Sequence, residues 1–146
     1  MSHLTAIELK IRDLEVLKRT AEYDFNALWL ENKPEYGWFG RSVGGYPLPD
    51  GFTKEMLGKC DHVIHLPGCK YEIGVVKRPD GTYTMLHDFW GPGQKLQERF
   101  GVGLKKLTQM YSVNVATKAA QAKGYTVSRV AGKNGAIKLQ VTGAGL

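Results

Sequence analysis

Residues 71–90, YEIGVVKRPDGTYTMLHDFW, decide the fold of this chain because they read as a complete β-hairpin. Apolar side chains alternate along 71–76, which is the period-two pattern of a strand with one buried face. Arg-Pro-Asp-Gly at 78–81 predicts a tight turn, since proline presets φ and glycine accepts a positive φ. Residues 82–90 then form the return strand, so the stretch predicts two adjacent antiparallel strands.

The segments before this hairpin predict further strands and one helix. Residues 5–11 alternate between apolar and charged side chains, as a half-buried strand does. Asp13 is suited to cap a helix, because its carboxylate can accept hydrogen bonds from free N–H groups of the first turn. Apolar residues then recur every three or four positions, which indicates a helix. Two more strands are expected at 27–31 and 62–66.

Two helical stretches and a second hairpin are expected after Gly91-Pro92-Gly93. Apolar residues recur every three or four positions over 96–111, although Gly101 and Gly103 weaken this helix by about 1 kcal/mol each relative to alanine. These glycines are consistent with a kink or a close backbone contact. A second helical stretch, 113–123, ends at Gly124. The closing hairpin pairs 125–131 with 136–142 around the turn 132–135 and places Ile137, Leu139 and Val141 inside.

The predicted element order is β-α-β-loop-β-β-β-α-α-β-β. This order is typical of an α+β fold, with two or three helices packed on one face of a mostly antiparallel sheet. We expect one domain spanning residues 1–146. The loop, residues 32–59, is rich in glycine and proline but also in aromatic residues, so we expect it to be ordered, with one helical turn near 53–57.

The charge of the chain is strongly asymmetric. Residues 94–146 hold nine basic residues and one acid, Glu98, for a net charge of +8, whereas residues 1–93 have a net charge of −2. A basic half attracts anions, which include nucleic acids, phosphorylated small molecules, acidic proteins and anionic membranes. Charge alone does not distinguish among these four classes of partner.

Bulk composition indicates a soluble globular protein. No apolar run approaches the roughly 18 residues that span a bilayer, so we expect no membrane partner. No secretory signal is visible at the N-terminus. Two cysteines, Cys60 and Cys69, are too few for a disulfide scaffold, and we expect them to be reduced thiols in a cytoplasmic protein.

One candidate anion site combines the turn at 91–93 with the helix that follows it. A helix N-terminus presents free N–H groups, and Lys95 and Arg99 add positive charge. Trp90 could stack on a base, while the aromatic loop 36–46 could supply the opposite wall. The predicted ligand-binding residues are Trp38, Arg41, His87, Trp90, Lys95, Arg99, Lys105 and Lys106. The alternative is ordinary turn chemistry, with Trp90 in the core.

A basic helical surface is a second candidate. Lys105 and Lys106, together with Lys95, Arg99 and Lys118, could contact nucleic-acid phosphates. The alternative is a solvated helix face. Aromatic residues are sparse there, which argues against a platform dedicated to single strands.

Metal binding and catalysis have weaker signals. Cys60, His62, His65 and Cys69 are zinc-ligand types, but their spacing is unusual, and His62 and His65 would point to opposite faces of a strand. We therefore expect no metal and no other cofactor. His87 and Asp88 are adjacent on a strand and cannot share a site directly. No nucleophile motif or phosphate-binding glycine loop is present, so the chain leans away from an enzyme.

Three segments carry a resemblance to a known family. They are the Met-Ser-His-Leu opening with Ile7 to Asp13, the hairpin with Asp-Phe-Trp-Gly at 88–91, and Leu-Thr-Gln-Met-Tyr-Ser-Val at 107–113 with the residues up to Tyr125. Together they resemble the proteins named after hypothetical chloroplast reading frame thirty-five, catalogued as domain of unknown function twelve fifty-seven. The family occurs in plastids, cyanobacteria, other bacteria and phages. The resemblance excludes loop 32–59 and implies no established activity, cofactor or catalytic residue.

We expect a non-enzymatic binding protein for a nucleotide or another phosphorylated small molecule. For a phage member, sequestration of a signalling nucleotide is a conceivable use. Some bacterial family members lie near genes for AAA-type ATPases, which implies the alternative of a protein-interaction module, an ATPase accessory or a homo-oligomer. Nucleic-acid binding is the second alternative.

Overall fold

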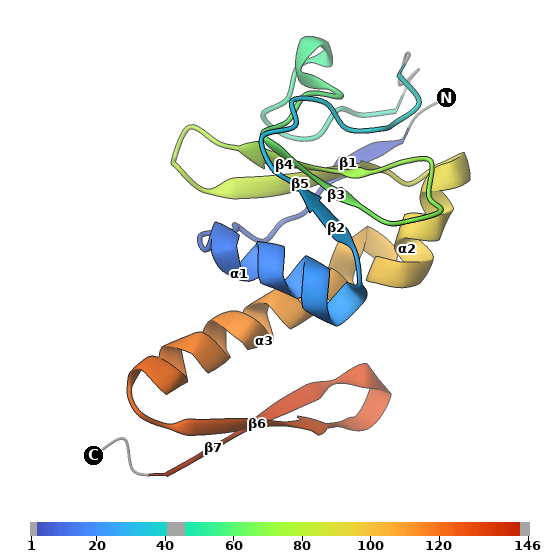
Figure 1. Ribbon diagram of the computed structural model, residues 1–146. Helices are drawn as coiled ribbons and strands as arrows, with labels where there is room; N and C mark the ends of the chain where they lie inside the picture. The colour runs from blue at the N-terminus through green and yellow to red at the C-terminus, as the bar shows by residue number, and fades with distance from the viewer. Residues whose placement is uncertain (1–2, 41–45, 144–146) are drawn as a thin grey trace.

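The larger of two sheets has five strands, all antiparallel to their neighbours, in the order β1-β5-β4-β3-β2 (Figure 1). The structure is a computed structural model that describes residues 3–40 and 46–143. Helices cover one face of the sheet, so the chain has the expected α+β fold and element order. The strands are β1 (Leu4–Ala6), β2 (Leu28–Leu30), β3 (His62–His65), β4 (Ile73–Lys77) and β5 (Tyr83–Asp88).

The hairpin that decides the fold forms the two strands β4 and β5 in the interior of this sheet. Val75 pairs with Met85 across the two strands. The predicted turn is confirmed, because the Gly81 N–H donates to the Arg78 carbonyl over 2.9 Å and Gly81 has a φ of +85°. The Asp80 carboxylate accepts hydrogen bonds from the Thr82 backbone and hydroxyl. The turn is thus fixed by local chemistry.

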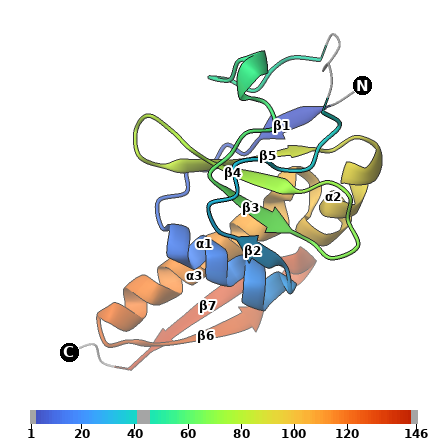
Figure 2. The ribbon, with the colours of Figure 1, turned by 45° about the horizontal axis from the view of Figure 1, so that its top comes forward.

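Three helices lie against one face of the five-stranded sheet (Figure 2). Asp13 caps the first of them, as predicted, by accepting a hydrogen bond from Val16 N over 3.1 Å. This helix continues into a π-helical turn over Thr20–Asp24. The helices are α1 (Leu14–Arg19), α2 (Gln94–Phe100) and α3 (Lys105–Ala122).

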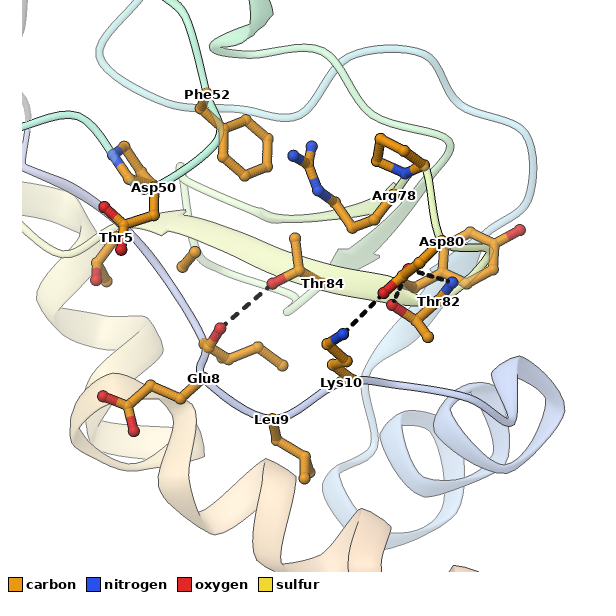
Figure 3. A pocket seen from close by; sticks show the side chains of 15 residues that line it. Thr5, Glu8, Leu9, Lys10, Asp50, Phe52, Arg78, Asp80, Thr82 and Thr84 are labelled. Carbon is orange, nitrogen blue, oxygen red and sulfur yellow. Dashed lines mark hydrogen bonds and ion pairs between the residues drawn. The ribbon is translucent and has the colours of Figure 1, made fainter.

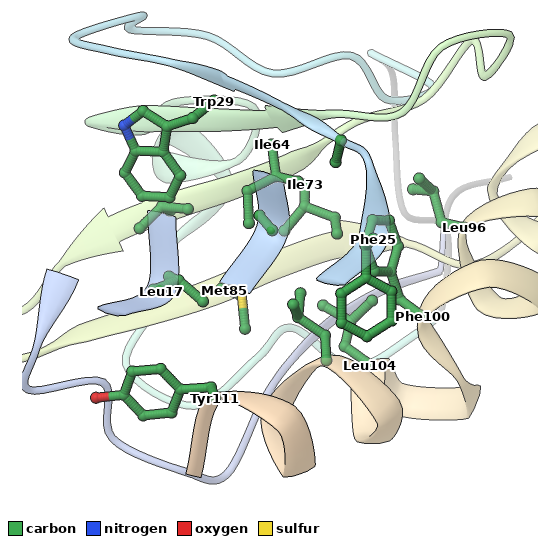
Figure 4. Packing of buried hydrophobic residues seen from close by; sticks show 14 of the residues in the cluster. Leu17, Phe25, Trp29, Ile64, Ile73, Met85, Leu96, Phe100, Leu104 and Tyr111 are labelled. Carbon is green, nitrogen blue, oxygen red and sulfur yellow. The ribbon is translucent and has the colours of Figure 1, made fainter. Parts of the chain in front are cut away.

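The main hydrophobic core fills the space between the helices and the sheet (Figure 4). Ile73 and Met85 from the sheet and Phe100 and Leu104 from the helical side are all fully buried. Tyr111 of α3 adds a polar link at the edge of this core, because its hydroxyl accepts from the backbone N–H groups of residues 12 and 13. The start of α1 is thereby attached to α3.

The two helices α2 and α3 are separated by a sharp break at residues 101–104. Gly101 and Gly103 have φ values of +86° and +64°, which side-chain-bearing residues rarely adopt, so the predicted kink is confirmed. The predicted division into helical stretches 96–111 and 113–123 is wrong, because α3 runs unbroken from Lys105 to Ala122. Leu104 also has a positive φ, of +59°.

The described parts of loop 32–59, residues 32–40 and 46–59, cover the opposite face of the sheet. The loop residues Tyr36, Phe52 and Leu57 form a second core with buried strand residues such as Val63 and Leu86. The Tyr36 ring lies directly on Gly74 of β4, where a Cβ atom would clash with it. The expected helical turn is present as a short 3-10 helix, Lys54–Met56. The loop is therefore a structural layer of the fold.

The C-terminal hairpin forms a sheet of its own. Its strands are β6 (Thr126–Ala131) and β7 (Ile137–Thr142), and they pack on the side of α3 that faces away from the large sheet (Figure 1). The expectation that Ile137, Leu139 and Val141 lie inside needs correction. Ile137 and Leu139 are only half-buried and Val141 is 50% exposed, because α3 is the hairpin's main support.

Candidate functional site

Lys95 and Arg99 lie one helical turn apart on α2 and line the same cavity, of about 410 Å³. The other lining residues are Glu98 and the loop Leu66–Cys69. Both basic side chains are exposed, and neither forms an ion pair with any residue in the described part of the chain. The Arg99 guanidinium lies 5.2 Å from the centre of the Phe25 ring, which supports it against the core.

The cavity lies along the side of α2 rather than at the turn that precedes it. Residues 91–93 form a 3-10 turn and are not part of the cavity lining. Their N–H groups are largely occupied, since Gly93 N donates to the Trp90 carbonyl and Gln94 N to the carbonyls of the turn. A Cβ atom at Gly93 would also clash with the Asp88 carbonyl. The cavity that Lys95 and Arg99 share thus does not include the turn, and an anion site at the start of the helix stays a prediction.

The cavity has an uncharged thiol in its lining. Burial raises the pKa of the Cys69 thiol, while the neighbouring Lys95 ammonium acts in the opposite direction and Glu98 raises it further. The thiol therefore stays protonated at neutral pH. Glu98 is the single carboxylate in the lining, against two positive charges.

Asp88 organises the region around Trp90. Its side chain is fully buried and accepts three backbone hydrogen bonds, from His3 N and Trp90 N on Oδ1 and from Phe39 N on Oδ2. The carboxylate thereby joins β1, loop 32–59 and the end of β5. The juxtaposition of the aromatic loop with the end of this strand, expected from the sequence, is present.

Trp90 is 53% exposed, so the alternative that places it in the core is wrong. The His3 ring lies edge-on to it, with ring centres 4.7 Å apart, and also contacts Tyr46 at 4.5 Å and Phe89 at 5.5 Å. This aromatic group borders neither Lys95 nor Arg99 in a shared cavity. Trp90 therefore does not line the cavity that Lys95 and Arg99 share.

His87 is fully buried and cannot touch a ligand in this conformation. Neither ring nitrogen has a hydrogen-bond partner among the described residues. Burial lowers the pKa of His87 to about 4, against the weaker opposing influence of the Gln97 side chain and the Asp88 carboxylate. The ring is therefore neutral at physiological pH.

The remaining predicted ligand-binding residues are dispersed. Trp38 is half-buried in the second core, with its indole against Gly58, and Arg41 lies outside the described residues. Lys105 borders a different cavity, of about 400 Å³, next to residues 5–9. Lys106 is exposed and is not part of that lining. The predicted basic helical surface is also divided, because Lys118 is paired with Asp13 at 2.8 Å.

The candidate zinc ligands have separate partners. His62 stacks on Trp29 and accepts a hydrogen bond from Asn32 N, whereas His65 bonds Glu72 at 2.9 Å. Both cysteines are free thiols. In the part of the chain that the structure describes, no group of three or more His, Cys, Asp or Glu residues could hold a metal ion.

A cavity of about 680 Å³, larger than the one beside α2, was not indicated by the sequence (Figure 3). It lies between residues 5–10, the loop at 49–52 and the turn of the central hairpin. Lys10 pairs with Asp80 at 2.8 Å, whereas Arg78 donates to the Gly51 carbonyl and its guanidinium lies 4.2 Å from the centre of the Phe52 ring. The carboxylates of Glu8 and Asp50 also line this cavity. The pairing with Lys10 and hydrogen bonds from Thr82 hold the pKa of Asp80 well below its usual value. With three carboxylates against two basic groups in its lining, this cavity is less favourable to an anion than the one beside α2.

A polar cluster joins the C-terminal hairpin to the body of the protein. Asn114 of α3 donates to Thr20 Oγ1 and Asp24 Oδ2, each over 2.8 Å, and accepts from Arg129 of β6. Arg129 also pairs with Asp24 at 3.2 Å. No sequence signal indicated this cluster, because Asp24 lies 90 positions from Asn114 and 105 positions from Arg129.

Comparisons with known proteins give one match. A family model described as "Protein of unknown function (DUF1257)" matches residues 49–140, which span β3 to most of β7. No curated protein and no solved structure matches the chain. Within residues 3–40 and 46–143, no helix is long and apolar enough to cross a membrane.

Proposed function

The chain belongs to the DUF1257 family, which has no known function, and from the geometry beside α2 we propose that it is a non-enzymatic binding protein for a phosphorylated small molecule. A nucleotide is the preferred ligand class. The site is the α2 cavity, lined by Lys95, Arg99, Glu98 and the loop Leu66–Cys69.

The convergence of Lys95 and Arg99 on one cavity without a carboxylate partner carries this proposal. Unpaired basic groups form charge-assisted hydrogen bonds with phosphate oxygens, and a guanidinium can do so with two parallel bonds. The Lys95 ammonium adds a compact second charge, so the pair can balance a phosphate dianion. The volume of about 410 Å³ lies within the usual range for small-ligand sites, roughly 300–1,000 Å³.

The chemistry of the lining favours binding over catalysis. A reactive cysteine requires a thiolate, but the pKa of the Cys69 thiol is raised by burial. Glu98 is exposed and pairs with neither base among the described residues, and its charge would repel a ligand phosphate rather than react with it. The site therefore holds charge in place without supplying a nucleophile.

Thermal denaturation at low salt tests this proposal. The panel comprises inorganic phosphate, AMP, ATP and a cyclic dinucleotide, each measured by the melting temperature and, where it rises, by calorimetric titration. A ligand that binds only the folded state stabilises it by about 2.7 kcal/mol at one hundred times its Kd. We expect at least one nucleotide to do so and inorganic phosphate to bind more weakly.

Lys95→Glu/Arg99→Glu should abolish this stabilisation while leaving the fold intact, because both side chains are exposed. Lys133→Glu/Lys138→Glu is the matched control, since it makes the same change in net charge on the distant C-terminal hairpin. The proposal fails if no phosphorylated compound stabilises the wild type, or if the two double variants lose binding equally.

A further inference from the structure

The β6–β7 hairpin presents one face that is exposed along its whole length. Pairing of Val127 with Val141 and of Arg129 with Leu139 sets the register, so alternate residues point toward α3 and the others point away. All the outward residues are exposed. They are Thr126, Ser128, Val130, Lys138, Gln140 and Thr142.

The hairpin is held so that this outer face stays clear of the rest of the chain. Its inner face packs on α3, and Arg129 attaches it to Asn114 of α3 and to Asp24 of the π-helical turn. In Figure 1 the two strands lie beneath α3, remote from the five-stranded sheet. An isolated two-stranded sheet is marginally stable in water, and these contacts supply its support.

The charge around this face has one sign. Residues 99–146 hold eight basic residues and no acid. Lys118 and Arg129 are neutralised by Asp13 and Asp24, whereas Lys123, Lys133 and Lys138 are exposed without an ion pair to any described residue. These three lysines mark the start of the hairpin, its turn and its second strand. A polyanion that follows the long axis of the hairpin could contact all three.

We propose that the outer face of the β6–β7 hairpin binds double-stranded DNA by entering the major groove. This goes beyond the proposed small-molecule site and does not depend on it. Paired strands are about 5 Å apart, so a two-stranded ribbon with its side chains fits a groove about 12 Å wide. The major groove of duplex RNA is too narrow for such an entry.

The outward side chains have the chemistry that groove recognition requires. Gln140 is an amide of the kind that contacts adenine edges, while Lys138 is left to contact phosphate. Thr126, Ser128 and Thr142 can bond to bases or phosphates, and Val130 offers an apolar contact for a thymine methyl group. No carboxylate lies on this face to repel phosphate.

Fluorescence anisotropy with a labelled 20-base-pair duplex of mixed sequence tests this inference. Three lysine–phosphate contacts predict a slope of about −2.7 for log affinity against log salt, or about a 40-fold loss between 50 and 200 mM salt. Lys133→Glu/Lys138→Glu should weaken binding more than tenfold and flatten the slope. Lys95→Glu/Arg99→Glu, with the same change in net charge, should change the affinity less than threefold.

Three results would overturn the inference. They are no binding at 50 mM salt, an equal loss in both double variants, and tighter binding of duplex RNA or single-stranded DNA than of duplex DNA. Far-UV circular dichroism and the melting temperature verify that each variant is folded. Loss of nucleotide binding in Lys95→Glu/Arg99→Glu leaves this outcome unaffected, so the two proposals succeed or fail separately.

Discussion

His87 should make the stability of this protein fall steeply in mild acid. The ring lies on β5 with no exposed surface and no hydrogen-bond partner among the described residues. Two positions away on the same face, Met85 is part of the main core. Protonating the ring in the folded state would place a charge in this apolar layer, so folding excludes the proton.

The magnitude follows from the difference between the two states. Burial lowers the pKa of His87 from 6.5 to about 4 in the folded protein. As the pH falls below 6.5, the unfolded chain gains a proton that the folded chain does not, so the free energy of unfolding decreases. The decrease approaches 1.4 kcal/mol per pH unit, and totals about 3 kcal/mol by pH 4, below which this contribution levels off.

Urea denaturation of the wild type and His87→Met between pH 7.5 and 4 measures this effect. Methionine cannot titrate and fills a similar space, so the difference in unfolding free energy between variant and wild type should grow by about 3 kcal/mol over this range. At pH 7.5 the variant should be neutral or stabilising, since it removes unsatisfied polar atoms from the core. Met85→Leu, a change in the same layer, should retain the wild-type dependence. Parallel curves for the wild type and His87→Met would refute the argument.

Two further predictions concern other buried groups. Asp88→Asn should lower the free energy of unfolding by about 2–3 kcal/mol in urea denaturation, because the amide nitrogen cannot accept the hydrogen bond from Phe39 N–H. The control Asp50→Asn changes an exposed side chain and should alter the free energy of unfolding by less than about 0.5 kcal/mol. Burial and the nearby Asp61 and Glu72 charges raise the pKa of Cys60 to about 12. Alkylation of this thiol at pH 8, measured by peptide mapping, should therefore be about a thousandfold slower in the native protein than in urea. Equal rates in the two states would contradict this prediction.

The elements that local sequence patterns specify were predicted correctly. The central hairpin depends on the alternation of apolar residues and on Pro79 and Gly81, all within 20 positions, and Asp13 caps α1 through a bond only three residues away. Such features need no tertiary information. Strand ends differed by one to several residues, as at β1, because pairing partners set where a strand stops.

The errors arose where tertiary packing decides. The α3 helix joins the main core through Leu107 and Tyr111 and packs on the C-terminal hairpin through another face, so its apolar residues follow no single stripe. For this reason the sequence divided residues 96–123 at the wrong place. The hairpin residues Ile137 and Val141 alternate as core residues do, but a single helix cannot cover them fully.

The role of loop 32–59 illustrates another limit. The aromatic residues of the loop predict that it is ordered. The sequence does not predict which surface the loop packs against, because the contact of Tyr36 with Gly74 joins positions 38 residues apart. The loop closes the second face of the sheet and brings Phe39 to Asp88. Its aromatic residues thereby stabilise the fold. Trp38, which the sequence predicts to contact a ligand, packs in the second core and does not line the cavity of Lys95 and Arg99.

The asymmetry of charge has a more specific meaning in three dimensions than in the sequence. Two of the nine bases after residue 93 neutralise Asp13 and Asp24 and hold α3 and the hairpin in place. Two more meet beside α2, and three follow the hairpin, on surfaces built from different elements. If only the total charge of the C-terminal part mattered, reversing any two of its basic residues would weaken binding of every polyanion equally. If the separate clusters bind different ligands, reversing the charges of one cluster should weaken only the binding of its own ligand. Reciprocal loss of nucleotide and DNA binding in the two double variants would therefore show that position, rather than net charge, determines what this protein binds.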